Sequence, residues 1–307
     1  MTINKILAAI DLGPDTEKIL AYAEWLYKVV ISVTGDTQIF YGIDKDKKGD
    51  AQIEMLYVID YAVTPPAYLT PYIEKEKRLD EGELKKWADK LNNMGIKIRH
   101  TIAVGRLIDA FNTIIKEIRA DILVLGYRSH VIRPSSSERI IKSLNIPMLV
   151  IRGKKSEGAY IGGISIKRIL CAVDFSEPSK KALEFARSLS EETSSELVVT
   201  HIISSLKIEK GFKKWKDLTE KDKSNYSSGL IENAEEQMCS LLKVCNKTEG
   251  IVKIGIPHET INNLATQTDA DIIVIGARGL SYTKGLLLGS VSESVIKSSP
   301  CPVIIVR

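Results

Sequence analysis

The sequence has few cysteines, and those it has are not arranged in a motif. Its 307 residues contain four cysteines and no C-x-x-C pair. Cys171 and Cys301 lie inside apolar, strand-like runs, where we interpret them as small core residues. A reduced protein is the simplest expectation.

A strong net charge and a long apolar run are also missing. The 43 basic and 39 acidic residues leave a net charge of only +4, so no strong field draws the chain to nucleic acid or anionic lipid, and we do not expect it to bind nucleic acid. No stretch approaches the roughly 18 consecutive apolar residues that a membrane span needs. The first residues, MTINKILAAID, hold too short an apolar run for a signal peptide. We therefore expect a cytoplasmic location.

Common catalytic and nucleotide-binding motifs are absent as well. The sequence has neither G-x-x-x-x-G-K-[ST] nor G-x-G-x-x-G. Its four histidines, His100, His130, His201 and His258, show neither metal-ligand spacing nor a nucleophile and base pair. Neither a metal site nor a hydrolytic triad is expected, and His201 is interpreted as a core or pocket-edge histidine.

What the sequence does have is an internal repeat. KILAAIDLGPDTEKILAYAEWL from Lys5 corresponds to RILCAVDFSEPSKKALEFARSL from Arg168. In each copy a short apolar strand ends at an aspartate, Asp11 or Asp174, and a helix with apolar residues at three- and four-residue spacing follows. ADILVLG and ADIIVIG, and then the last 18 residues of each half, correspond in the same way.

The repeat predicts the fold class. Each half alternates strands and helices and ends on a strand, and continuous Val, Ile and Leu runs are typical of parallel strands covered on both faces. We predict an α/β protein of two tandem Rossmann-like domains, each a five-stranded parallel sheet flanked by helices. The expected domains are residues 1–152 and 163–307, joined by a linker, Gly153–Ser165, rich in glycine and charge.

Glycines cluster after one of these strands, in GARGLSYTKGLLLGS, Gly276 to Ser290. Ligands of open parallel sheets bind at the carboxyl ends of the strands. If Gly276 ends the strand and Ser290 opens a helix, then free backbone N–H groups and the helix dipole favour an anion there. The alternative is that the glycines only form a turn and Ser290 only caps the helix.

The spacing G-x2-G-x9-G-S resembles that of the nucleotide-binding members of the universal stress protein family. Asp174 at the end of the first strand and the SPCPVIIV ending are also similar to that family. The resemblance covers nearly the whole chain as two tandem copies. It implies an adenine nucleotide hydrolase-like fold and, as ligand, ATP, ADP or AMP, with or without magnesium.

Carried over by position, the resemblance implies a cofactor site of ten residues in the second half. Those against adenine and ribose are Ala172, Asp174 and Ile202, the last through its backbone. Those on the ribose and phosphate side are Gly276, Arg278 and Gly279. Those that hold the phosphates are Gly289, Ser290, Val291 and Ser292. Lys284 either reaches the outer phosphate or stays in solvent.

The first half departs from this pattern. After Gly126 it reads YRSHVIRPSSSE, so Ser129 and Pro134 replace the second and third glycines. Pro134 lacks the backbone N–H that a phosphate would need. We predict that the first domain does not bind ATP in the family's manner, and that Arg128 either attracts another anion or is an exposed structural residue.

The leading hypothesis is a nucleotide-binding regulatory or stress-response protein rather than an enzyme. One alternative is a slow ATP hydrolase, for which Asp174 is the obvious carboxylate. Another is a protein-interaction scaffold without a nucleotide. The resemblance also implies an intramolecular pseudo-dimer of the two halves through 146–152 and 302–307, a further homodimer, and an unidentified downstream protein partner.

Overall fold

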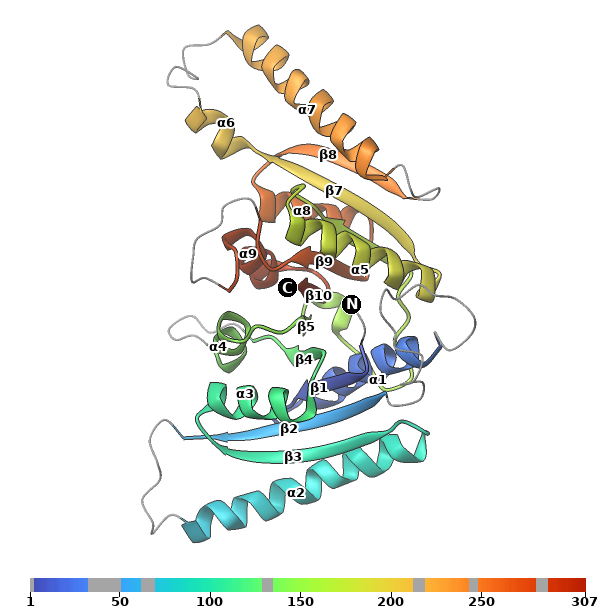
Figure 1. The fold of residues 1–307 in the computed structure, drawn as a ribbon, viewed down its shortest axis with the longest axis vertical. Helices are drawn as coiled ribbons and strands as arrows, with labels where there is room; N and C mark the ends of the chain where they lie inside the picture. The colour runs from blue at the N-terminus through green and yellow to red at the C-terminus, as the bar shows by residue number, and fades with distance from the viewer. Residues whose placement is uncertain are drawn as a thin grey trace. The chain divides into compact units, whose positions relative to one another are not determined.

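The computed structural model describes residues 3–32, 51–61, 70–128, 135–211, 219–242, 248–279 and 287–307 (Figure 1). The chain divides into two compact units. The first is Met1–Arg152 with Ser156–Ser165, and the second is Gly153–Lys155 with Ile166–Arg307.

The first unit is a parallel sheet with the strand order β3-β2-β1-β4-β5. Its strands are β1 (Lys5–Ala9), β2 (Gln52–Asp60), β3 (Ile98–Gly105), β4 (Ile122–Gly126) and β5 (Met148–Ile151). The helices between them are α1 (Thr16–Ser32), α2 (Thr70–Asn93), α3 (Leu107–Ile118) and α4 (Ser136–Ser143). The strand order reverses between β1 and β4, as in doubly wound folds.

The second unit repeats this arrangement with the order β10-β9-β6-β7-β8. Its strands are β6 (Arg168–Ala172), β7 (Glu196–Ser204), β8 (Glu249–Gly255), β9 (Ile272–Gly276) and β10 (Val303–Val306). The helices are α5 (Glu177–Thr193), α6 (Ser205–Gly211), α7 (Glu220–Leu242), α8 (Pro257–Gln267) and α9 (Ser290–Ser298). The prediction of two five-stranded parallel α/β sheets is confirmed.

Burial explains why these runs form central strands. Every residue of β9, which lies inside the strand order of the second unit, is buried, because helices cover both faces of a parallel sheet. The last strands of the two units, β5 and β10, are also buried at every residue. The edge strands β3 and β8 are more exposed. Figure 1 shows α2 along β3 and α7 along β8, and these pairs are in contact.

The segment predicted as a linker, Gly153–Ser165, is more ordered than its composition suggested. It contains a short 3-10 helix, η3 (Lys154–Ser156). Ile161 is buried, and the N–H of Gly162 donates to Glu24 Oε2 at 3.1 Å. Part of this segment therefore belongs to the packing of the first unit.

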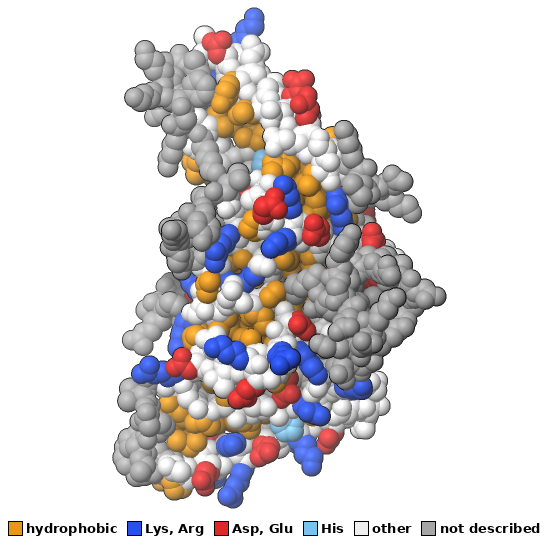
Figure 2. All heavy atoms as spheres, viewed as in Figure 1, with side chains coloured by type: hydrophobic (Ala, Val, Ile, Leu, Met, Phe, Trp, Pro, Cys, Tyr) orange, Lys and Arg blue, Asp and Glu red, His pale blue; other side chains and the backbone are white. Residues whose placement is uncertain are grey.

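Charge is mixed on the surface. On the face drawn in Figure 2, blue and red side chains alternate without a region of one sign, as the near balance of basic and acidic residues predicts. Among the described helices, none combines the length and apolarity that crossing a membrane requires.

Candidate functional site

The ends of three neighbouring strands bring the predicted residues of the second unit to one edge of its sheet. In the pairing register Ala172 of β6 lies beside Thr200 of β7 and Ile275 of β9. Asp174 follows two residues after Ala172. The strand order reverses between β6 and β9, which is where open α/β sheets bind ligands.

Asp174 is held in place by the start of α5. Its Oδ1 accepts hydrogen bonds from the backbone N–H and the hydroxyl of Ser176, at 3.2 and 2.5 Å. Its own N–H donates to Ser179 Oγ at 3.2 Å. Ser176 is also the N-cap of α5. The D-F-S-E-P-S sequence thus caps a helix and fixes the Asp174 carboxylate with the same residues.

The glycines after β9 allow a close approach of backbone to other atoms. A Cβ at Gly279 would lie 2.2 Å from Asp174 Oδ2, and a Cβ at Gly276 would lie 3.1 Å from the carbonyl group of Pro178. Neither glycine is among those with positive φ. Close approach, rather than an unusual backbone angle, therefore explains these two glycines: to the Asp174 carboxylate at Gly279 and to the backbone of Pro178 at Gly276.

Helix α9 begins at this edge without a side-chain cap. Gly289 is its N-cap, and none of the described side chains accepts a capping hydrogen bond there. The Gly289 N–H donates to Ala277 O at 2.7 Å, which ties the helix start to the end of β9. Ser290 and Val291 are exposed. The first turn of α9 therefore presents backbone donors and the positive end of the helix dipole.

The hydroxyl of Ser292 has a structural partner. Ser292 is buried and donates to Gly276 O at 2.8 Å. This bond joins the first turn of α9 to the end of β9. The Ser292 hydroxyl thus has a partner within the chain, and its expected role at the phosphates stays a prediction.

A positively charged residue that the sequence analysis missed lies in the same region. Burial, and after it the charge of Arg278, lower the pKa of Arg307 to about 10. Arg307 Nη1 also donates to Leu287 O at 2.8 Å. The first repeat ends on Arg152 in the same position, and that shared ending was the available signal.

The remaining predicted residues lie at the ends of β6 and β7. Ile202 is buried in β7. Its neighbour His201 places Nδ1 2.8 Å from Val173 O and its ring centroid 4.4 Å from that of Phe175. His201 thus has partners within the chain, and its interpretation as a core or pocket-edge histidine stays a prediction. Lys284 lies outside the described residues.

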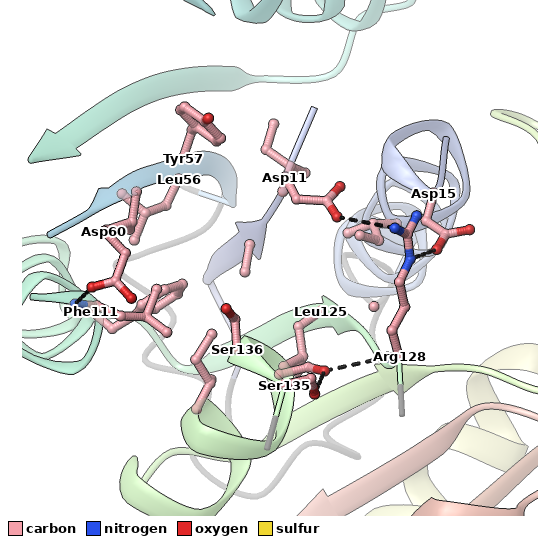
Figure 3. A pocket seen from close by; sticks show the side chains of 18 residues that line it. Asp11, Asp15, Leu56, Tyr57, Asp60, Phe111, Leu125, Arg128, Ser135 and Ser136 are labelled. Atoms are coloured by element: carbon pink, nitrogen blue, oxygen red, sulfur yellow. Dashed lines mark hydrogen bonds and ion pairs between the residues drawn. The ribbon is translucent and has the colours of Figure 1, made fainter. Parts of the chain in front are cut away.

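The first unit has a cavity at the corresponding edge (Figure 3). Its volume is about 260 Å³. Several lining residues are repeat counterparts of the predicted nucleotide site. They are Ala9, Asp11, Val58, Gly126, Arg128, Ser135, Ser136 and Ser137, which correspond to Ala172, Asp174, Ile202, Gly276, Arg278, Ser290, Val291 and Ser292.

The start of α4 differs from that of α9. Ser135 Oγ accepts from the Glu138 N–H at 3.2 Å, and Glu138 Oε2 accepts from the Ser135 N–H at 3.0 Å. These two bonds form a capping box, so backbone donors at this helix start already have partners within the chain. Ser129 and Pro134, on which the sequence argument rested, lie outside the described residues.

Arg128 is also engaged within the first unit. Its Nε donates to Asp15 Oδ2 at 2.9 Å, and its Nη1 lies 4.0 Å from Asp11 Oδ2. Burial alone would raise the pKa of Asp15, but hydrogen bonds from Lys18 and Arg128 outweigh it and lower the pKa. Among the described residues, no group of three or more His, Cys, Asp or Glu side chains could hold a metal ion.

Comparison with known proteins gives the family. The profile of the universal stress protein family matches residues 2–152 and again residues 165–307. Universal stress protein MJ0577 of Methanocaldococcus jannaschii is 32% identical over 156 residues, which are 47% of this chain and 96% of that protein. Universal stress protein YxiE of Bacillus subtilis is 34% identical over 148 residues, 46% of this chain and 98% of that protein.

A solved structure resembles the chain over its whole length. The crystal structure of a universal stress protein from Archaeoglobus fulgidus has a TM-score of 0.66 and 21% identity, and the match covers 100% of this chain and 99% of that one. This likeness supports the fold. The two profile matches show that the chain belongs to the universal stress protein family, with two copies of the family's domain in tandem.

Proposed function

We propose that the second unit binds an adenine nucleotide, with ATP as the first candidate, and that the chain is a nucleotide-binding regulatory protein of a stress response. The observation that carries this proposal is the approach of the Gly279 backbone to the Asp174 carboxylate, close to the start of α9, which none of the described side chains caps. Family membership supports the same function.

Asp174 and its neighbours would receive the nucleoside part. An ionised carboxylate only accepts hydrogen bonds, so Asp174 suits the hydroxyl groups of a ribose. Ser176 holds the carboxylate in place. The adenine would lie against Ala172 and the backbone of Ile202, beside the end of β7.

The start of α9 would receive the phosphates. Backbone N–H groups of Ser290 and Val291 and the helix dipole favour negative charge there, whereas the Gly289 N–H already donates to Ala277 O. The positive charges of Arg278 and Arg307 act in the same direction. Because the Ser292 hydroxyl is bound to Gly276 O, we assign Ser292 a role through its backbone. Magnesium, if present, would be held by the phosphates of the nucleotide.

The substitution Gly279→Ala tests this proposal. The added methyl group would displace the carboxylate of Asp174, since it would otherwise lie 2.2 Å from Oδ2. We expect titration calorimetry to give about one ATP per chain and the variant to lose affinity roughly tenfold or more, as for a lost hydrogen bond to a charged group. Gly82→Ala on α2 is the matched control, because a Cβ at Gly82 meets nothing within 4 Å.

Two results would contradict the proposal. Equal ATP affinity of the Gly279→Ala and wild-type chains would contradict the assignment of the binding site to Gly279 and Asp174. No ATP binding by either chain would favour the nucleotide-free scaffold.

Two further measurements identify the ligand and its fate. Mass spectrometry of nucleotide released from the purified chain would distinguish ATP, ADP and AMP. Steady phosphate release that Asp174→Ala abolishes would instead favour the slow hydrolase. The pairing of the two halves, the homodimer and the cytoplasmic location stay predictions.

A further inference from the structure

The cavity of the first unit has an apolar floor. Figure 3 shows Leu56, Phe111 and Leu125 among the side chains that line it, and we call the apolar part of this lining its floor. The apolar lining side chains are Ala9, Ile10, Ile19, Leu56, Val58, Leu107, Phe111, Leu125 and Ile140. At about 260 Å³ the cavity is slightly smaller than typical ligand pockets of roughly 300–1,000 Å³. Its size and lining suit one small, ring-bearing molecule.

The rim of this cavity carries hydrogen-bond acceptors on two sides. Figure 3 shows Asp60 on one side and Asp11 on the other. Asp60 accepts from the Leu107 N–H at 3.0 Å and from Arg139 Nη1 at 2.9 Å. Asp11 accepts from the Gly13 N–H at 3.0 Å. An ionised carboxylate can accept about four hydrogen bonds. Asp11 and Asp60 can therefore each accept further hydrogen bonds from a ligand.

The same rim disfavours a phosphate. The capping box of Ser135 and Glu138 uses backbone donors at the start of α4, and Arg128 is bound to Asp15. The second repeat has Pro178 and Ser204 where this one has Asp15 and Asp60, so this edge has two carboxylates that the second repeat lacks. Arg128 and Arg139 are paired with these two carboxylates and are therefore not available to an added anion. Such an anion would also lie near the carboxylate of Asp11, which has the same sign of charge.

We propose that this cavity is a second ligand site, and that it binds a phosphate-free molecule of nucleoside size. A planar ring lies on the apolar floor, and hydroxyl or amino groups donate to Asp11 and Asp60. The proposal concerns another site than the nucleotide site of the second unit, and it stands on the cavity itself. It makes the first unit a sensor of a neutral compound instead of an inactive copy.

Adenosine is the test probe, because it combines a planar ring with neighbouring hydroxyl groups and carries no phosphate. The full chain is titrated with adenosine and with AMP by calorimetry in the presence of saturating ATP, which would occupy the second unit. We expect one adenosine to bind per chain. The affinity for AMP should be lower by roughly tenfold or more because of charge repulsion. Asp11→Ala should lower the affinity for adenosine by roughly tenfold or more. Asp89→Ala, at an exposed position of α2, should leave this affinity unchanged.

Methyl NMR gives a readout that does not depend on the variant. Adenosine should shift the methyl signals of Leu56 and Leu125 in the wild-type chain. Absence of adenosine binding, AMP as tight as adenosine, or unchanged affinity in Asp11→Ala would each overturn the proposal. If ATP does not bind at all, adenosine is titrated alone. The same methyl shifts and the same loss of adenosine affinity in Asp11→Ala then decide whether this cavity binds the nucleoside. Failure at this site and failure of the proposed function are thereby distinguishable.

Discussion

The Ser292 hydroxyl donates to the carbonyl of Gly276 at 2.8 Å and joins the first turn of α9 to the end of β9. Both residues are buried, so Ser292→Ala would leave a buried carbonyl without this partner. We expect the free energy of unfolding to fall by about 1–3 kcal/mol, measured by urea denaturation. Ser290→Ala, at an exposed neighbouring position, should change it by less than about 0.5 kcal/mol. An equal effect of the two substitutions would contradict the structural role of Ser292.

The hydrogen bond between Ser292 and Gly276 is a feature that could not be predicted from the sequence, unlike the two sheets. Strand runs and the repeat predicted both sheets, because burial on two faces leaves continuous apolar segments. The glycine spacing predicted an open turn after β9 at which an anion could approach the backbone, and it did not predict the approach of Gly279 to Asp174. It could not tell which way the Ser292 hydroxyl points, since that depends on how α9 packs against β9. The position of Arg307 near Arg278 likewise depends on tertiary structure.

The capping box of α4 could have been predicted from the sequence. Ser135 and Glu138 have the S-x-x-E spacing of a capping box, and the structure contains that box. The prediction that the first repeat does not bind ATP rests on Ser129 and Pro134 in place of two glycines and on the missing N–H of Pro134. The capping box supplies a second reason, independent of the loop before it, why phosphate donors are fewer at α4 than at α9.

A side-chain cap introduced at the start of α9 should raise the stability of the chain and lower its affinity for ATP. Gly289 has φ −80° and ψ 153°, which other residues adopt readily, and a Cβ there would be in ordinary contact at 3.4 Å. We expect Gly289→Ser to raise the free energy of unfolding by a few tenths of a kcal/mol. The new hydroxyl would occupy backbone donors of the first turn, so ATP affinity should fall. Thermal denaturation and calorimetry on the same sample measure both, and a parallel rise of the two would contradict the phosphate assignment.

Cysteine reactivity should follow burial. Burial raises the pKa of the Cys171 and Cys301 thiols to about 12, so almost no reactive thiolate forms at mildly alkaline pH. Cys239 is exposed on α7. We expect iodoacetamide to alkylate Cys239 in the native chain and to spare Cys171 and Cys301 until the chain is unfolded, as peptide mass spectrometry would measure. Cys245 lies outside the described residues. Early labelling of Cys171 would contradict its place in β6.

The ion pair of Asp15 and Arg128 should stabilise the first unit in a pH-dependent way. Hydrogen bonds from Lys18 and Arg128 outweigh the effect of burial and hold the folded-state pKa of Asp15 below its ordinary value of 3.8. The folded chain then binds fewer protons at this site than the unfolded chain, so the stabilisation is complete above the unfolded pKa and is lost as the pH falls through the folded pKa. We expect Asp15→Asn to be less stable than wild type at neutral pH and the difference to disappear in acid. Urea denaturation across that pH range measures it, with Asp89→Asn, an exposed carboxylate on α2, as the control; a difference that persists in acid would mean that the loss comes from packing rather than from charge.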